Sequence, residues 1–93
     1  VPILTFKNFD EVIERANDND LGLCSYLYTN SMDKAHIGSE KLETGCVAVN
    51  TGVVALAEAP FGGIKQTGYG REGGSGAIKD YLNVKYTHMG LKI

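Results

Sequence analysis

Apolar and polar positions in the first part of the chain follow the period of an amphipathic helix. Four apolar residues are spaced i, i+3, i+4 and i+7, which places them on one face: Phe9, Val12, Ile13 and Ala16. Asn8 is suited to cap this helix, and Glu11 completes a capping-box pattern three residues later. The polar run NDND ends the pattern at residues 17–20. The sequence therefore predicts a helix within residues 7–20.

Three uncharged stretches predict strands. Residues 1–6 are apolar and β-branched enough for a short strand. Residues 21–29 are rich in Leu and Tyr and lie between glycine and asparagine, which is typical of a buried strand. Residues 46–50, CVAVN, are small and β-branched, as in a strand that is buried on both faces.

Two further helices are expected between and after these strands. Residues 31–45 begin with Ser31 as a cap and end at Gly45, which is placed as a C-terminal stop. Ser75 is suited to cap a shorter helix over 76–83, whose apolar residues share one face.

The end of the chain changes from helical to strand periodicity. Val84, Tyr86 and His88 alternate with more polar positions over 84–89, which predicts a half-exposed strand. The resulting order, β-α-β-α-β-loop-α-β, indicates an α/β fold with parallel strands and crossover helices. The last strand has no obvious place in such a small sheet. We therefore expect it to pair with another subunit or domain.

Length and charge narrow the function classes. Ninety-three residues make one small domain, and the net charge of -2 is spread over the chain. Neither a basic face for nucleic acid nor a polybasic membrane patch is present in the sequence. No apolar run reaches the ~18 residues of a membrane span. Because the chain has no initiator Met and begins within a predicted strand, we expect it to be part of a longer protein.

Two cysteines indicate the compartment. Cys24 and Cys46 both lie in apolar stretches, and neither has a histidine nearby in sequence. The favoured interpretation is a pair of buried thiols in a reducing, cytoplasmic environment. A disulfide or a catalytic thiol remains the alternative.

The loop EAPFGGIKQTGYGREGG, residues 58–74, holds six of the twelve glycines. It lacks the phosphate-binding pattern G-x-x-x-x-G-K-[ST]. Gly68, Gly70 and Gly73 have dinucleotide-fingerprint spacing, but no strand closely precedes them and no acidic partner follows about 20 residues later. A flexible linker would lack large apolar anchors, whereas this loop contains three: Phe61, Ile64 and Tyr69. We expect an ordered loop that serves a larger domain.

The loop and its flanks carry a family resemblance. APFGGIKQTGYGREGG, preceded by GCVAVN and followed by AIKDYLNVKYTHMGL, resembles the C-terminal end of NAD(P)-dependent aldehyde dehydrogenases. The closing part is most similar to succinate-semialdehyde dehydrogenases. The resemblance implies that residues 1–74 are the end of the catalytic domain. Residues 75–83 would then be a connecting helix, and 84–93 the strand of the oligomerisation arm.

The resemblance also implies which functions belong to this chain and which belong to the rest of the enzyme. The full enzyme would oxidise a small aldehyde, foremost succinate semialdehyde, through a catalytic cysteine and a general-base glutamate that lie outside this chain. Cys24 and Cys46 match neither motif. NAD or NADP would bind in the full enzyme and not to this segment, so the sequence does not distinguish the two cofactors. Residues 84–91 would join subunits of a homo-oligomer. The alternative function is a stand-alone, non-catalytic α/β assembly module.

Five residues of the site are implied in the same way. Phe61 matches the aromatic beside the substrate, although it can equally anchor its loop. Val53 and Ala55 match the segment that sets substrate specificity, and Ala55 replaces a serine that binds the substrate's distal carboxylate. Lys65 and Gly68 match positions that bind a monovalent cation through backbone carbonyls; the alternative is a solvated lysine beside a turn glycine. His36 and His88 are interpreted as structural.

Overall fold

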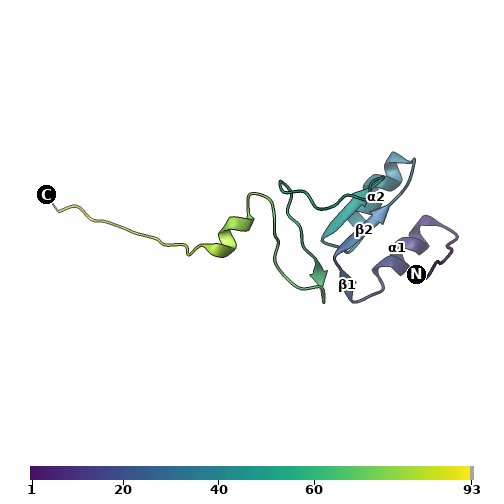
Figure 1. The fold of residues 1–93 in the computed structure, drawn as a ribbon, viewed down its shortest axis with the longest axis horizontal. Coiled ribbons are helices and arrows are strands. Elements are labelled where there is room, and N and C mark those ends of the chain that lie inside the picture. Colours follow the sequence, from purple (N-terminus) through teal and green to yellow (C-terminus); the bar gives the residue numbers. More distant parts are fainter. Residues whose placement is uncertain (93) are drawn as a thin grey trace.

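The computed structural model describes residues 1–92, which form a small folded body followed by an extended tail (Figure 1). The molecule measures 75 × 27 × 21 Å, and the tail accounts for its length. The N-terminus lies in the body beside the first helix, and the other end of the chain lies at the far end of the tail. Among residues 1–92, no helix is long and apolar enough to cross a membrane.

The first helix, α1 (Phe9–Asn17), begins and ends where the sequence predicts. The Asn8 side chain accepts a hydrogen bond from the Glu11 N–H at 3.0 Å, which satisfies one free donor of the first turn. In a capping box the Glu11 carboxylate would accept in return from the Asn8 N–H. Here it accepts from the N–H of the preceding residue, Lys7, at 2.9 Å. Ile13, on the apolar face, is buried.

The second helix, α2 (Met32–Lys41), has the predicted cap but a different end. Ser31 Oγ accepts from the Lys34 N–H at 3.3 Å. The prediction that Gly45 stops this helix is wrong, since the helix ends at Lys41 and Leu42 is its C-cap. Gly45 instead lies against the backbone of the glycine-rich loop.

The predicted parallel pairing is confirmed for the two central strands. Strand β2 (Cys24–Leu27) pairs in parallel with β3 (Cys46–Val49), and α2 forms the connection between them. Ala48, in the middle of β3, is 4% exposed. This pair and the helices beside it form the folded body (Figure 1).

A second, antiparallel pairing was not predicted. The stretch expected as one strand over 21–29 is divided into β1 (Leu21–Gly22) and β2. Strand β1 pairs with β4 (Ile64–Lys65), which lies inside the glycine-rich loop. The loop is therefore tied to the body by its own short strand.

Three other predictions differ from the structure. Residues 1–6 form no strand. The helix near the end is a short 3₁₀ helix, η1 (Ala77–Tyr81), and its cap position is Gly76 with no side-chain bond, not Ser75. Residues 82–92 form no strand within this chain. Because a strand needs a neighbour for its hydrogen bonds, pairing of 84–91 with another subunit stays a prediction.

The apolar core of this chain is small. Among the described residues, the buried apolar side chains are Ile13 and Ala48. Many large apolar side chains are exposed at both ends, including Ile3, Val84 and Tyr86. Exposure of so many large apolar side chains is typical of surfaces that contact other protein.

Candidate functional site

The glycine-rich loop is closed at its base by two residues. Phe61 and Glu72 lie opposite each other and exchange both backbone hydrogen bonds: Phe61 N–H donates to the Glu72 carbonyl at 2.7 Å, and Glu72 N–H donates to the Phe61 carbonyl at 2.8 Å. The Arg71 guanidinium also bridges the loop, donating to the carbonyls of Gly63 at 2.8 Å and Gly70 at 2.7 Å. The expectation of an ordered loop is therefore met by specific bonds.

The glycines of the loop allow its tight turns. Four of them have positive φ: Gly68, Gly70, Gly73 and Gly74. At Gly73, with φ +69°, an added Cβ would lie 2.6 Å from the Ala59 carbonyl oxygen, so a side chain has no room. The three expected anchors differ, because Phe61 and Ile64 are half-buried whereas Tyr69 is fully exposed. Tyr69 does not anchor the loop within this chain.

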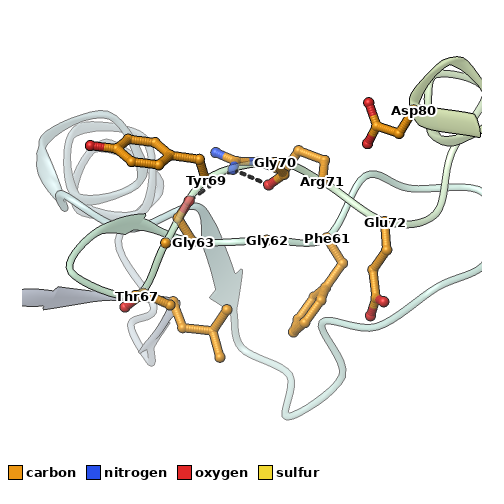
Figure 2. A pocket seen from close by; sticks show the side chains of 11 residues that line it. Phe61, Gly62, Gly63, Thr67, Tyr69, Gly70, Arg71, Glu72 and Asp80 are labelled. Atoms are coloured by element: carbon orange, nitrogen blue, oxygen red, sulfur yellow. Dashed lines mark hydrogen bonds between the residues drawn. The ribbon is translucent and has the colours of Figure 1, made fainter. Parts of the chain in front are cut away.

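The Phe61 side chain borders two hollows on the loop. One, of about 370 Å³, also involves Thr67, Arg71, Glu72 and Asp80. Figure 2 shows Phe61 and Glu72 projecting to one side of the loop, with Tyr69 and Arg71 on the other. The arrangement gives the loop one face with an aromatic ring and a carboxylate.

The second hollow brings together two residues that the sequence singled out. It measures about 290 Å³ and is lined by Ala55, Leu56, Ala57, Phe61, Glu72 and Gly73. Ala55 and Phe61 therefore share one surface, whereas Val53 does not line it and is 60% exposed. Glu72 is the charged residue of this lining, and within residues 1–92 no basic side chain joins it.

The two cysteines are neighbours across β2 and β3. Cys24 and Cys46 are register partners, both are half-buried, and both are free thiols. Burial raises the pKa of the Cys24 thiol, and the adjacent Cys46 raises this pKa further. A thiol with a raised pKa is a poor nucleophile at neutral pH. The environment of Cys24 therefore favours a structural role over a catalytic one.

Lys65 and Gly68 lie on the edge of the loop that faces the body. The Lys65 carbonyl accepts from the Gly68 N–H at 3.3 Å, so these two residues form a tight turn. The Lys65 ammonium is not solvated as the alternative supposed, because it contacts backbone carbonyls of α1 and the segment after it. Binding of a monovalent cation by the backbone of these two residues stays a prediction. The part of the chain that is described contains no cluster of three or more His, Cys, Asp or Glu able to hold a metal.

The histidines lie away from this loop. His36 is exposed on α2 and faces Glu40 at 3.6 Å, and His88 lies in the tail, 3.1 Å from the Tyr86 hydroxyl. Neither contacts the residues around Phe61. A structural interpretation of both fits these positions.

Sequence reasoning missed the roles of the charged residues in the loop. The sequence motif includes Arg71 and Glu72 but predicts no role for either, and it predicts no contacts for the Lys65 side chain. The available signal is an arginine beside turn glycines, since a guanidinium has five N–H donors for free backbone carbonyls.

The loop does not fit a dinucleotide. Within residues 1–92, the fingerprint glycines Gly68, Gly70 and Gly73 are followed by the 3₁₀ helix η1 and by no α-helix. A pyrophosphate site needs that helix end.

Comparison with known proteins places the chain in a family. Residues 1–87 match the aldehyde dehydrogenase family. The chain is 47% identical to 3-sulfolactaldehyde dehydrogenase of Pseudomonas putida, covering 96% of this chain and 18% of that protein. It is 44% identical to succinate-semialdehyde dehydrogenase [NADP(+)] of Escherichia coli, covering 97% and 19%.

A solved structure agrees with these relatives. An aldehyde dehydrogenase of Bacillus cereus in complex with NAD+ superposes with a TM-score of 0.84 at 44% identity, covering 88% of this chain and 17% of that one. The chain thus spans less than a fifth of the length of the proteins it matches. The match over residues 1–87 and these identities show that the chain belongs to the aldehyde dehydrogenase family.

Proposed function

We propose that this chain is the C-terminal part of an NAD(P)-dependent aldehyde dehydrogenase and supplies one wall of its substrate channel. The whole enzyme oxidises a short aldehyde, foremost succinate semialdehyde, to the carboxylic acid. The observation that carries the proposal is the common hollow of Ala55 and Phe61, because both residues that the family resemblance assigns to the substrate line one surface.

Phe61 is the substrate-facing residue of this wall. Its ring is half-buried and its backbone is fixed on both sides by the bonds to Glu72. An apolar ring held in place contacts the carbon chain of an aldehyde and excludes water from the reacting carbonyl. The chain's contribution to catalysis is therefore binding and orientation.

The names of the relatives support the proposed substrate class. Both 3-sulfolactaldehyde and succinate semialdehyde are short aldehydes with an anionic group at the far end. The hollow near Phe61 contains the carboxylate of Glu72 and, within residues 1–92, no basic side chain. Ala55 has no hydrogen-bond donor in its side chain. We therefore assign the main partners of the anionic end to groups outside this chain.

We also assign the reactive groups to the part of the enzyme outside this chain. In the described part of the chain, the glycines of the loop are not followed by the α-helix that a dinucleotide site needs, and the raised pKa of Cys24 disfavours attack by its thiol. NAD or NADP, the catalytic cysteine and the general base belong to the remainder of the enzyme. The tail over 84–91 is the segment that contacts another subunit, since its apolar side chains are exposed.

One experiment separates this proposal from a stand-alone assembly module. The whole protein that contains this chain is incubated with succinate semialdehyde and either NAD or NADP, and formation of the reduced cofactor is followed. The isolated 93-residue chain is assayed in parallel. We expect turnover only by the whole protein. A whole protein that reduces neither cofactor with any short aldehyde would refute the enzymatic function. Turnover by the isolated chain would refute the assignment of the catalytic groups to the rest of the enzyme.

A further inference from the structure

The side chain of Lys65 is held by three oxygen atoms. Its ammonium donates to the Asn17 carbonyl at 2.8 Å and the Asn19 carbonyl at 3.2 Å, and it pairs with Glu43 Oε2 at 2.8 Å. The Lys65 side chain is 24% exposed, although most lysines extend into solvent. Asn17 is the last residue of α1, where the negative end of the helix dipole favours a cation.

The backbone at Lys65 also indicates that the side chain matters. Lys65 has φ +57°, in the left-handed region that is strained for residues with a Cβ. A glycine would adopt this conformation without strain. A glycine could not make the side-chain bonds to Asn17, Asn19 and Glu43, so these bonds favour lysine here despite the strain.

These contacts lie where the loop is attached to the body. The pairing of β4 with β1 contains only two residues from each strand. Gln66 N–H donates to the Asp20 carbonyl at 2.9 Å, and Gly22 N–H donates to Thr67 Oγ1 at 2.8 Å. Such a short strand pair is marginal by itself. Within residues 1–92, the Lys65 ammonium supplies the ionic contact at this attachment.

We propose that Lys65 is a positioning residue for Phe61. The ammonium fixes the arm of the loop from Phe61 to Thr67 against the end of α1, with Glu43 as its charged partner. The place of the Phe61 ring against the substrate then depends on a side chain that does not contact the substrate. This inference rests on the proposed function for its kinetic consequence, although attachment of the loop can be measured without activity.

The test compares two variants of the whole enzyme with the wild type. Lys65→Met removes the charge and keeps the length, and Glu43→Gln keeps an acceptor but removes the partner charge. We expect Lys65→Met to raise KM for the aldehyde about tenfold, as expected for losing hydrogen bonds to a charged group, with kcat and the cofactor KM within about twofold of wild type. Glu43→Gln is expected to raise the KM for the aldehyde by a smaller factor. The double variant should resemble Lys65→Met, because the two side chains act together.

Lys41→Met is the matched control. Lys41 is also a lysine at the end of a helix, but its nearest carboxylate, of Asp10, is 3.9 Å away and both side chains are exposed. It should leave the aldehyde KM unchanged. A Lys65→Met enzyme with lower kcat but normal aldehyde KM would overturn the proposal, because a merely structural defect reduces the amount of active enzyme and not its affinity.

Hydrogen exchange tests the attachment of the loop by Lys65 separately from the proposed enzymatic function. The amides of Gln66 and Phe61 are hydrogen-bonded, so their protection reports attachment of the loop independently of turnover. We expect Lys65→Met to lower protection at Gln66 strongly and that of α2 very little. Unchanged protection would refute the anchoring role. If the wild type oxidises no aldehyde, the proposed function fails, and loss of protection in the variant still supports Lys65 as the anchor of the loop.

Discussion

Gly45 lies against the carbonyl of Gly62, so close that a side chain at Gly45 would occupy the same space as that carbonyl oxygen. This contact joins the turn before β3 to the arm of the loop that begins at Phe61. It explains why a glycine is placed four residues beyond the end of α2, where it cannot serve as a helix cap.

Gly45→Ala should therefore destabilise the enzyme and disturb the loop. Overpacking of a close contact costs about 1–3 kcal/mol, which lowers the apparent Tm of the whole protein in thermal unfolding. Gly52→Ala is the matched control, because a Cβ at Gly52 meets no atom within 4 Å. Equal melting temperatures for the two variants would show that the close approach of Gly45 and Gly62 is not maintained in solution.

Ala55→Ser should shift specificity towards aldehydes with an anionic end. A serine hydroxyl at this position of the hollow can donate to a carboxylate, and a hydrogen bond to a charged group contributes about 1.5–3 kcal/mol. We expect the ratio of kcat/KM for succinate semialdehyde to that for butyraldehyde to rise about tenfold. A Val53→Ser control, outside the hollow, should change the ratio little. If the ratio is the same in Ala55→Ser and wild type, Ala55 does not face the substrate.

Cys24 should react slowly with iodoacetamide at neutral pH. Burial and the neighbouring Cys46 thiol raise the pKa of Cys24, so less thiolate is present at a given pH than for a free cysteine. Peptide mapping after timed alkylation should show slow labelling of Cys24 in the native protein, with a rate that still rises at pH values above the ordinary thiol pKa. Labelling in denaturant should be much faster. Equally fast labelling in both states would contradict the effect of burial.

The tail, residues 84–91, should determine the oligomeric state of the whole enzyme. Val84 and Tyr86 alternate with Lys85 and are exposed in this chain, so a partner strand would cover them on one face. Replacing both by aspartate should lower the molar mass of the whole enzyme in light scattering to that of a smaller assembly, because burying carboxylates in an interface is costly. Lys85→Asp is the control on the opposite face. An unchanged molar mass for the double variant would remove the tail from the interface.

Local signals in the sequence predicted α1, the start of α2 and the parallel pair of β2 and β3. The cap at Asn8, the apolar stripe around Ile13 and the cap at Ser31 each involve residues within a few positions of one another, so the sequence pattern contains the relevant physics. The shared hollow of Phe61 and Ala55 was anticipated only through the family resemblance, which had placed both residues at the substrate.

Contacts between distant segments could not be predicted in this way. The pairing of β1 with β4 and the bonds of Lys65 to Asn17 join residues more than forty positions apart. No periodicity reports such a contact. In the tail, the alternation of apolar and polar residues is typical of a strand. A strand needs a neighbouring strand, however, and residues 82–92 have none within this chain. Tyr69 was expected as an anchor for the same reason that the tail was expected as a strand, since an apolar residue indicates burial without saying against what.

The kinetics of Phe61→Ala in the whole enzyme test the central claim most directly. Tyr69→Ala, in the same loop but fully exposed, is the control. We predict that Phe61→Ala lowers kcat/KM for succinate semialdehyde by at least about tenfold, as expected for losing a large apolar contact with the substrate, while the affinity for NAD or NADP and the values for Tyr69→Ala stay within about twofold of wild type. An unchanged kcat/KM in a folded Phe61→Ala enzyme would contradict the assignment of this loop as a wall of the substrate channel.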